Sequence, residues 1–153
     1  MTSVELASML ARFAELEGRH PRILIATGCL ADETYLNLVA SRFADGGFDV
    51  DIAPSGSDAV SISQQVVDCD ADMLALVRVS VDHDDRVRVM DLQSALSAMD
   101  AEYIQFGIFG RPDDPARDNV DFLFDVAHFD IDDIISLMRF LLAVEEGRMV
   151  EGI

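Results

Sequence analysis

The hydrophobic pattern of the chain switches repeatedly between helical spacing and short, continuous apolar runs. Apolar residues from Val4 to Glu17 recur three and four positions apart, which predicts an amphipathic helix that ends at Gly18. The run Arg22–Ala26 is almost entirely apolar, as in a parallel strand that is buried on both faces. The later predicted strands are Phe48–Ala53, Asp72–Val79, Tyr103–Phe109 and Phe122–Val126. The later predicted helices are Asp32–Asp45, Asp58–Val67, Asp84–Met99 and Ile131–Glu146, and a polar loop covers Gly110–Asn119.

Strand and helix alternate five times, and this order predicts an α/β fold. The expected sheet is parallel, five-stranded and flavodoxin-like, in the order 2-1-3-4-5, with helices on both faces and an extra helix at the N-terminus. Ligands of such sheets bind beyond the carboxyl ends of the strands. The segments that reach this edge are Thr27–Asp32, Ser80–Asp85, Phe109–Pro112 and Ala127–Asp130.

The strongly negative net charge and the absence of Lys exclude several classes of function. Its 153 residues include 29 acidic and 11 basic side chains, for a net charge of −18, and every basic residue is Arg. Without Lys, the chain can form neither a Walker-type phosphate loop nor a Schiff base. The negative field opposes nucleic acid and anionic membranes, so we expect neither as a partner. With no spanning or signal-like apolar run, we expect a cytoplasmic protein whose Cys29 and Cys69 stay reduced.

The last predicted helix carries more apolar residues than one buried stripe needs. The surplus predicts a second contact, either with the leading helix Val4–Glu17 or with another copy of the chain in a homo-oligomer, through Ile131–Val144. The apolar residues of this helix are Ile131, Ile134, Ile135, Leu137, Met138, Phe140, Leu141, Leu142 and Val144.

Two segments carry a resemblance to a known family. "EGRHPRILIA", at residues 17–26, and "RFADGGFDVDIAP", at residues 42–54, resemble the cobalamin-binding domain of methylmalonyl-CoA mutase and related acyl-CoA mutases. The likeness continues through "DADMLALVRVS", "FGIFGRPDD" and "VDFLFDVAHFDIDDIISLMRFL", and spans roughly Glu17 to Leu142. It implies a lead-in helix in residues 1–20, a cobalamin-binding-like α/β domain in residues 21–146 and a C-terminal tail in residues 147–153.

The chain resembles this family in a degenerate form. The family signature after the first strand is Asp-x-His-x-x-Gly, whose His replaces the nucleotide base on cobalt; here Asp32 stands near the His position and no His is present. Ile108 replaces the second of two paired glycines, and Asp125–Phe129 replaces a small Gly-rich loop. We therefore expect no cofactor, with cobalamin that keeps its own base on cobalt as the alternative. The residues of the former cofactor pocket are Thr27, Gly28, Cys29, Asp32, Ser80, Gly107, Gly110 and His128.

Other chemistry is weakly supported by the residues. Asp82 and His83, with His128 from a neighbouring loop, are candidate metal ligands, and the alternative is a solvated loop whose acids cap the next helix. A haem bound through His83 or His128 is a further option. An active phospho-receiver is excluded, because the chain has no Lys and its strand ends lack the required acids.

These observations lead to one functional expectation with two alternatives. The chain is expected to be a non-catalytic, cobalamin-binding-domain-like subunit or regulatory module, associated with an acyl-CoA mutase and acting by protein contact. No residue is assigned a catalytic role. The alternatives are a small-molecule sensor that uses the former cofactor pocket and a subunit of an isomerase that binds cobalamin weakly.

Overall fold

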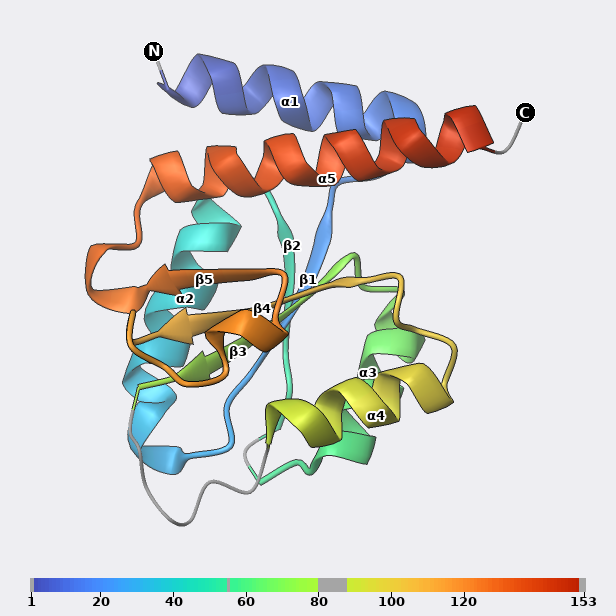
Figure 1. The fold of residues 1–153 in the computed structure, drawn as a ribbon. Helices are drawn as coiled ribbons and strands as arrows, with labels where there is room; N and C mark the ends of the chain where they lie inside the picture. Colours follow the sequence, from blue (N-terminus) through green and yellow to red (C-terminus); the bar gives the residue numbers. More distant parts are fainter. Residues whose placement is uncertain (1, 55, 80–87, 152–153) are drawn as a thin grey trace.

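The computed structural model describes residues 2–54, 56–79 and 88–151. It contains a five-stranded parallel sheet in the order β2-β1-β3-β4-β5, which confirms the predicted flavodoxin-like α/β fold (Figure 1). The strands are β1 (Arg22–Ala26), β2 (Asp49–Ile52), β3 (Met73–Arg78), β4 (Gln105–Gly110) and β5 (Phe122–Asp125). The α-helices are α1 (Thr2–Glu17), α2 (Glu33–Asp45), α3 (Ala59–Cys69), α4 (Val89–Ala98) and α5 (Ile131–Glu151). The 3₁₀ helices are η1 (Leu30–Asp32), η2 (Arg117–Asn119) and η3 (Val126–His128).

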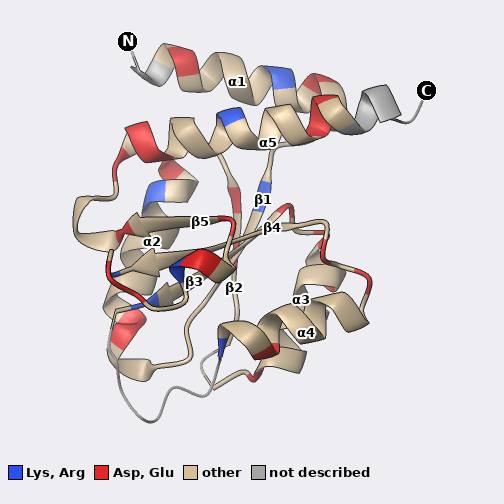
Figure 2. Ribbon diagram, in the orientation of Figure 1, with Lys and Arg blue, Asp and Glu red and all other residues tan. Residues whose placement is uncertain are grey.

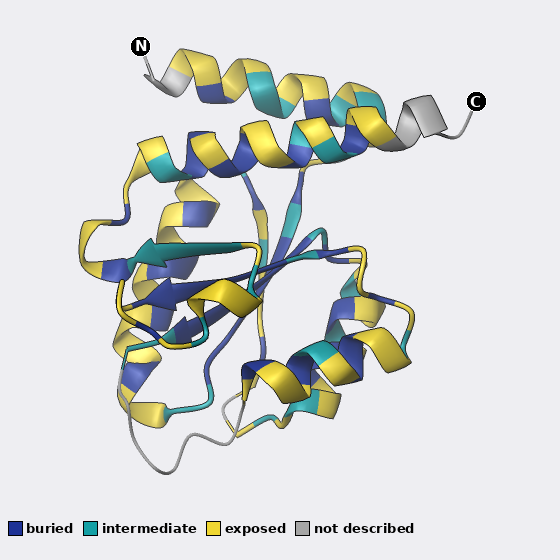
Figure 3. Ribbon diagram, in the orientation of Figure 1, coloured by how far each residue is buried: buried dark blue, intermediate teal, exposed yellow. Residues whose placement is uncertain are grey.

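The core lies on both faces of the sheet (Figure 3). Helices α2 and α5 cover one face, and α3 and α4 cover the other. The buried side chains alternate between these two cores along each strand, so that Leu24 and Leu76 face α3 and α4 while Ile23 and Val77 face α2 and α5. This two-sided burial explains why the inner strands read as unbroken apolar runs.

The surplus apolar residues of α5 have a partner within the chain. Helix α1 packs along the outer side of α5 as a fourth layer, with Leu6 and Phe13 buried in the shared core (Figure 1). Ion pairs join the two helices at their polar rims, Arg139 with Glu5 and Arg12 with Glu146. The first of the two predicted contacts is therefore present, and a homo-oligomer through Ile131–Val144 stays a prediction.

Several element ends differ from the predicted ones. Helix α5 continues to Glu151 instead of ending at Glu146. The helix predicted from Asp32 begins as the 3₁₀ turn η1, and its α-helical part starts at Glu33. Helix α4 begins at Val89 in the described part of the chain, while the predicted start at Asp84 lies outside it. No helix in the described residues is long and apolar enough to cross a membrane.

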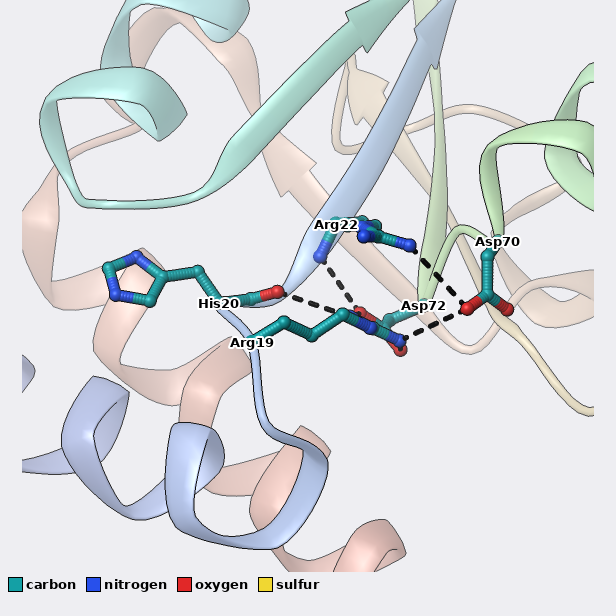
Figure 4. Close-up of polar contacts among 5 residues, drawn as sticks. All are labelled: Arg19, His20, Arg22, Asp70 and Asp72. Atoms are coloured by element: carbon teal, nitrogen blue, oxygen red, sulfur yellow. Dashed lines mark hydrogen bonds and ion pairs between the residues drawn. The ribbon is translucent and has the colours of Figure 1, made fainter.

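A charged cluster fastens the lead-in helix to the amino-terminal edge of the sheet (Figure 4). The guanidinium of Arg19 donates two hydrogen bonds to the carboxylate of Asp72, at 2.8 and 3.0 Å, and these bonds raise the pKa of Arg19. The backbone N–H of Arg22 donates a further hydrogen bond to Asp72 at 2.8 Å. Asp70 lies at the rim, 3.5 Å from Arg22, and His20 contacts the Gly47 carbonyl. Asp72 thus connects the segment after α1 to β1 and to the start of β3.

The crossover from β4 to β5 is the one connection in the sheet that contains no α-helix among its described residues. Residues 111–121 form a loop with the short η2 turn. The described helices on this face are α3 and α4, and a cavity of about 270 Å³ lies between α4 and the loop.

Candidate functional site

The turn after β1 is closed by its own side chains. Thr27 is buried, and its hydroxyl donates a hydrogen bond to the Val77 carbonyl of β3 at 2.9 Å. The same oxygen accepts a hydrogen bond from the Cys29 N–H at 3.3 Å. Cys29 is a free, half-buried cysteine. Thr27 therefore joins the ends of two neighbouring strands and leaves its hydroxyl engaged with backbone.

Asp32 is a buried carboxylate at this edge. Asp32 is 1% exposed. Its Oδ2 accepts a hydrogen bond at 3.0 Å from the backbone N–H of Val79, which lies just beyond β3. This bond spans 47 positions in the sequence and holds η1 against the end of β3. A carboxylate in this position satisfies a backbone donor in the protein interior, which is costly to leave unpaired.

The space beside Gly107 is filled by aromatic rings. A Cβ atom at Gly107 would lie 2.0 Å from the Phe122 ring, so the glycine exists to admit that ring. Phe109, two residues along β4, lies at the centre of the same group, and four ring centroids surround its own at 4.8–5.8 Å. The surrounding rings are those of Phe43, Phe122, Phe124 and Phe129.

Ile108, the residue that replaces the family's second glycine, is fully buried in the core beneath α3 and α4. It therefore faces the opposite side of the sheet from the ring of Phe109. Both sides of this part of β4 are occupied by apolar side chains.

Gly110 marks a close approach between two strand ends. A Cβ at this position would lie 2.0 Å from the Arg78 carbonyl oxygen, so no larger residue fits without moving backbone. Arg78 forms an ion pair with buried Asp114, with Nε and Oδ2 3.2 Å apart. These two residues line a cavity of about 160 Å³ at the carboxyl edge, together with Arg111 and Pro115. Sequence reasoning missed the pair, although an Arg at the end of an apolar strand is a signal that could have found it.

Of the remaining predicted residues with polar side chains, His128 is the one that lies in the described part of the chain. The side chain of His128 is 84% exposed and has Asp125 as an ion-pair partner at 3.8 Å. Ser80, Asp82 and His83 lie outside the described residues. Among the residues that the structure does describe, no group of three His, Cys, Asp or Glu side chains could hold a metal ion. The predicted metal site at Asp82, His83 and His128 therefore stays a prediction.

The residues at this edge do not fit His-ligated cobalamin. No His occurs between Ala26 and Glu33, and a carboxylate is a poor replacement for imidazole on cobalt. The carboxylate present, that of Asp32, is buried and bonded to backbone. The space beside Gly107 holds the Phe122 ring in place of any ligand atom.

Comparison with known proteins shows that this chain is similar in sequence to methylmalonyl-CoA mutases. No protein-family model matches it. It is 34% identical over 115 residues to mitochondrial methylmalonyl-CoA mutase from Mus musculus, which covers 72% of this chain and 14% of the mouse protein. It is 34% identical over 77 residues to the methylmalonyl-CoA mutase large subunit from Streptomyces virginiae, which covers 50% of this chain and 10% of that subunit.

The fold matches a crystal structure of a cobalamin-binding protein from Desulfitobacterium hafniense DCB-2. The TM-score is 0.63 at 18% sequence identity, and the match covers 89% of this chain and 67% of that chain. The chain is a cobalamin-binding-like domain, related to methylmalonyl-CoA mutase. The cobalamin-binding-like domain spans about 14% of the length of the mouse mutase. The predicted resemblance is thus confirmed for the fold and for the relationship to the mutases.

Proposed function

We propose that this cobalamin-binding-like domain is a non-catalytic subunit or regulatory module that acts, without bound cobalamin, by contact with a methylmalonyl-CoA mutase chain. The observation that supports the proposal is a mutase-related sequence in which Asp32 and Gly107, residues that the resemblance assigns to the cofactor pocket, are packed against other parts of the protein. A domain that had only lost its cobalt ligand would keep a hollow for the rest of the cofactor. Here Asp32 is buried, and the ring of Phe122 fills the space beside Gly107.

Exposed apolar side chains at the carboxyl edge support a protein contact. Leu30 is 73% exposed, Val60 is 60% exposed and Met90 is 62% exposed. They lie in η1 after β1, at the start of α3 after β2, and at the start of α4 after β3. In a parallel sheet these three positions share the edge at which the strands end (Figure 1). Separate elements therefore present large apolar groups on one side of the molecule, as the core of a protein interface does.

The surface charge agrees with a partner that is not itself strongly acidic. Acidic side chains lie on the sheet and on the helices of both its faces, and basic ones are few (Figure 2). With a net charge of −18, two copies of the domain repel each other at long range. A mutase chain with a basic patch would instead be attracted, and the association rate would fall as salt is added.

The proposal is tested by co-expressing the domain with the methylmalonyl-CoA mutase large subunit of its source organism and measuring their association. We expect a complex on size exclusion and a Kd that rises about tenfold or more when Leu30→Asp and Met90→Asp are combined, because a buried charge replaces an apolar contact. Val4→Asp is the matched control, since Val4 is comparably exposed but lies on α1 in the outer layer.

The outcomes separate the proposal from its competitors. A complex that resists the paired substitutions, or that weakens equally with Val4→Asp, contradicts docking through the carboxyl edge. Absence of any complex with the mutase chain overturns the proposal itself. Circular dichroism of each variant confirms that the substituted domains remain folded.

A further inference from the structure

The cavity of about 270 Å³ lies away from the carboxyl edge, beside the amino ends of β4 and β5. It exists because the β4–β5 crossover is a loop and leaves room next to α4 that a helix would otherwise fill. We propose that this cavity binds a small organic cation, whose charged group is carried on a short apolar body. The proposal is independent of the contact with a mutase chain.

The floor of the cavity is apolar. Leu96 of α4 and Ile104 and Phe106 from β4 and the turn before it line it, and each is nearly fully buried in the protein. A volume of this size is close to the lower limit of ordinary small-molecule sites. An apolar body of modest size would displace water from this floor and gain from its burial.

The rim of the cavity is acidic. Glu102 and Asp121 line it, and none of the described lining residues is basic. A cation held between apolar walls and these two carboxylates would form charge-assisted hydrogen bonds that an uncharged analogue cannot match. The net charge of −18 adds a long-range field that raises the local concentration of cations.

Asp121, one of the two acids of the rim, is held in position before any ligand arrives. The backbone N–H of Asp121 donates to the Phe106 carbonyl at 2.8 Å, and its carboxylate Oδ2 accepts from the Phe106 N–H at 2.8 Å. Across the cavity, the side-chain amide of Gln93 donates a hydrogen bond to the Asn119 carbonyl and ties α4 to the loop. A carboxylate that accepts a hydrogen bond from backbone, on a residue whose own N–H is also bonded, loses little freedom on binding, which favours affinity.

The test uses benzamidine, an amidinium on an apolar ring, and benzamide, its neutral analogue of nearly the same shape. Each is titrated into the full chain while backbone amide resonances are followed by NMR. We expect saturable shifts at Ile104, Phe106 and Val120 with benzamidine, and at least about tenfold weaker binding of benzamide. Glu102→Gln and Asp121→Asn should each weaken benzamidine binding about tenfold.

The control is Asp91→Asn, which removes one exposed acid of α4 that does not line the cavity. Its Kd for benzamidine should stay within about twofold of the parent, because Asp91 does not line the cavity and an exposed charge is screened by salt. Equal binding of benzamide and benzamidine overturns the proposal, as does an equal loss in Asp91→Asn or an absence of saturable shifts at the three amides. Glu102 is exposed, so Glu102→Gln keeps the test decisive even if Asp121→Asn perturbs the fold.

Discussion

Replacing Phe109 with alanine is expected to lower the free energy of unfolding by about 3–5 kcal/mol, the usual cost of removing a large buried aromatic side chain. Phe109 is fully buried, and its ring contacts those of Phe43, Phe122, Phe124 and Phe129. Its removal leaves a cavity that the neighbouring rings on β5, on α2 and in the loop before α5 can only partly fill. Urea denaturation followed by circular dichroism measures the loss.

The control for this substitution is Phe140→Ala on α5. Phe140 is 44% exposed, so its removal should cost about 1 kcal/mol or less. Similar losses for the two variants would contradict the central place of Phe109 in the aromatic group. The m-value should stay unchanged in both, because the surface exposed on unfolding is nearly the same.

Replacing Asp72 with asparagine is expected to cost about 2–3 kcal/mol. The carboxylate of Asp72 accepts two hydrogen bonds from Arg19 and one from the backbone N–H of Arg22, and its side chain is mostly buried. An amide carries no charge and offers one acceptor oxygen, so at least one donor of Arg19 or Arg22 would face an N–H group. Guanidinium chloride would screen the ion pair, and urea is therefore the denaturant of choice.

Asp70→Asn provides the comparison for Asp72→Asn. Both remove one negative charge from the same cluster, but the Asp70 side chain is mostly exposed and its ion pairs are 3.5 and 3.8 Å long. Asp70 also has φ of 54°, a conformation that Asn tolerates better than most residues. We expect a loss of about 0.5 kcal/mol. A larger loss from Asp70→Asn than from Asp72→Asn would show that the bidentate contact with Arg19 is not what holds this edge.

The parts of the fold that sequence could predict are those in which local pattern and tertiary environment agree. The strand Arg22–Ala26 was predicted with its observed ends, because a strand covered on both faces must be apolar throughout. The end of α5 was predicted too early, because the polar residues Glu145 and Glu146 do not stop the helix, which continues to Glu151. The excess of apolar residues on α5 is visible in the sequence. Whether these residues pack against α1 or against a second copy of the chain is decided by the three-dimensional packing.

In the candidate site, too, the sequence predicts local positions but not the contacts between distant segments. The position of Asp32 after the first strand was apparent from the sequence, whereas its hydrogen bond to Val79, 47 positions away, depends on the order of the strands. Gly107 was assigned to the former cofactor pocket by resemblance. Its actual neighbour, Phe122, follows from the register in which Gly107 of β4 pairs with Phe122 of β5. Register between strands is set by the assembled sheet and is not legible in either strand alone.

We expect that the domain does not bind cobalamin, because protein side chains occupy the room that the cofactor would need. Co-elution of hydroxocobalamin with the domain measures this binding. The purified domain is incubated with excess hydroxocobalamin, passed over a desalting column and examined for corrinoid absorption in the visible range. Co-elution detects cobalamin whether a His or the cofactor's own base lies on cobalt. The account predicts that the protein fractions stay colourless. A red protein fraction with stoichiometric corrinoid would contradict it.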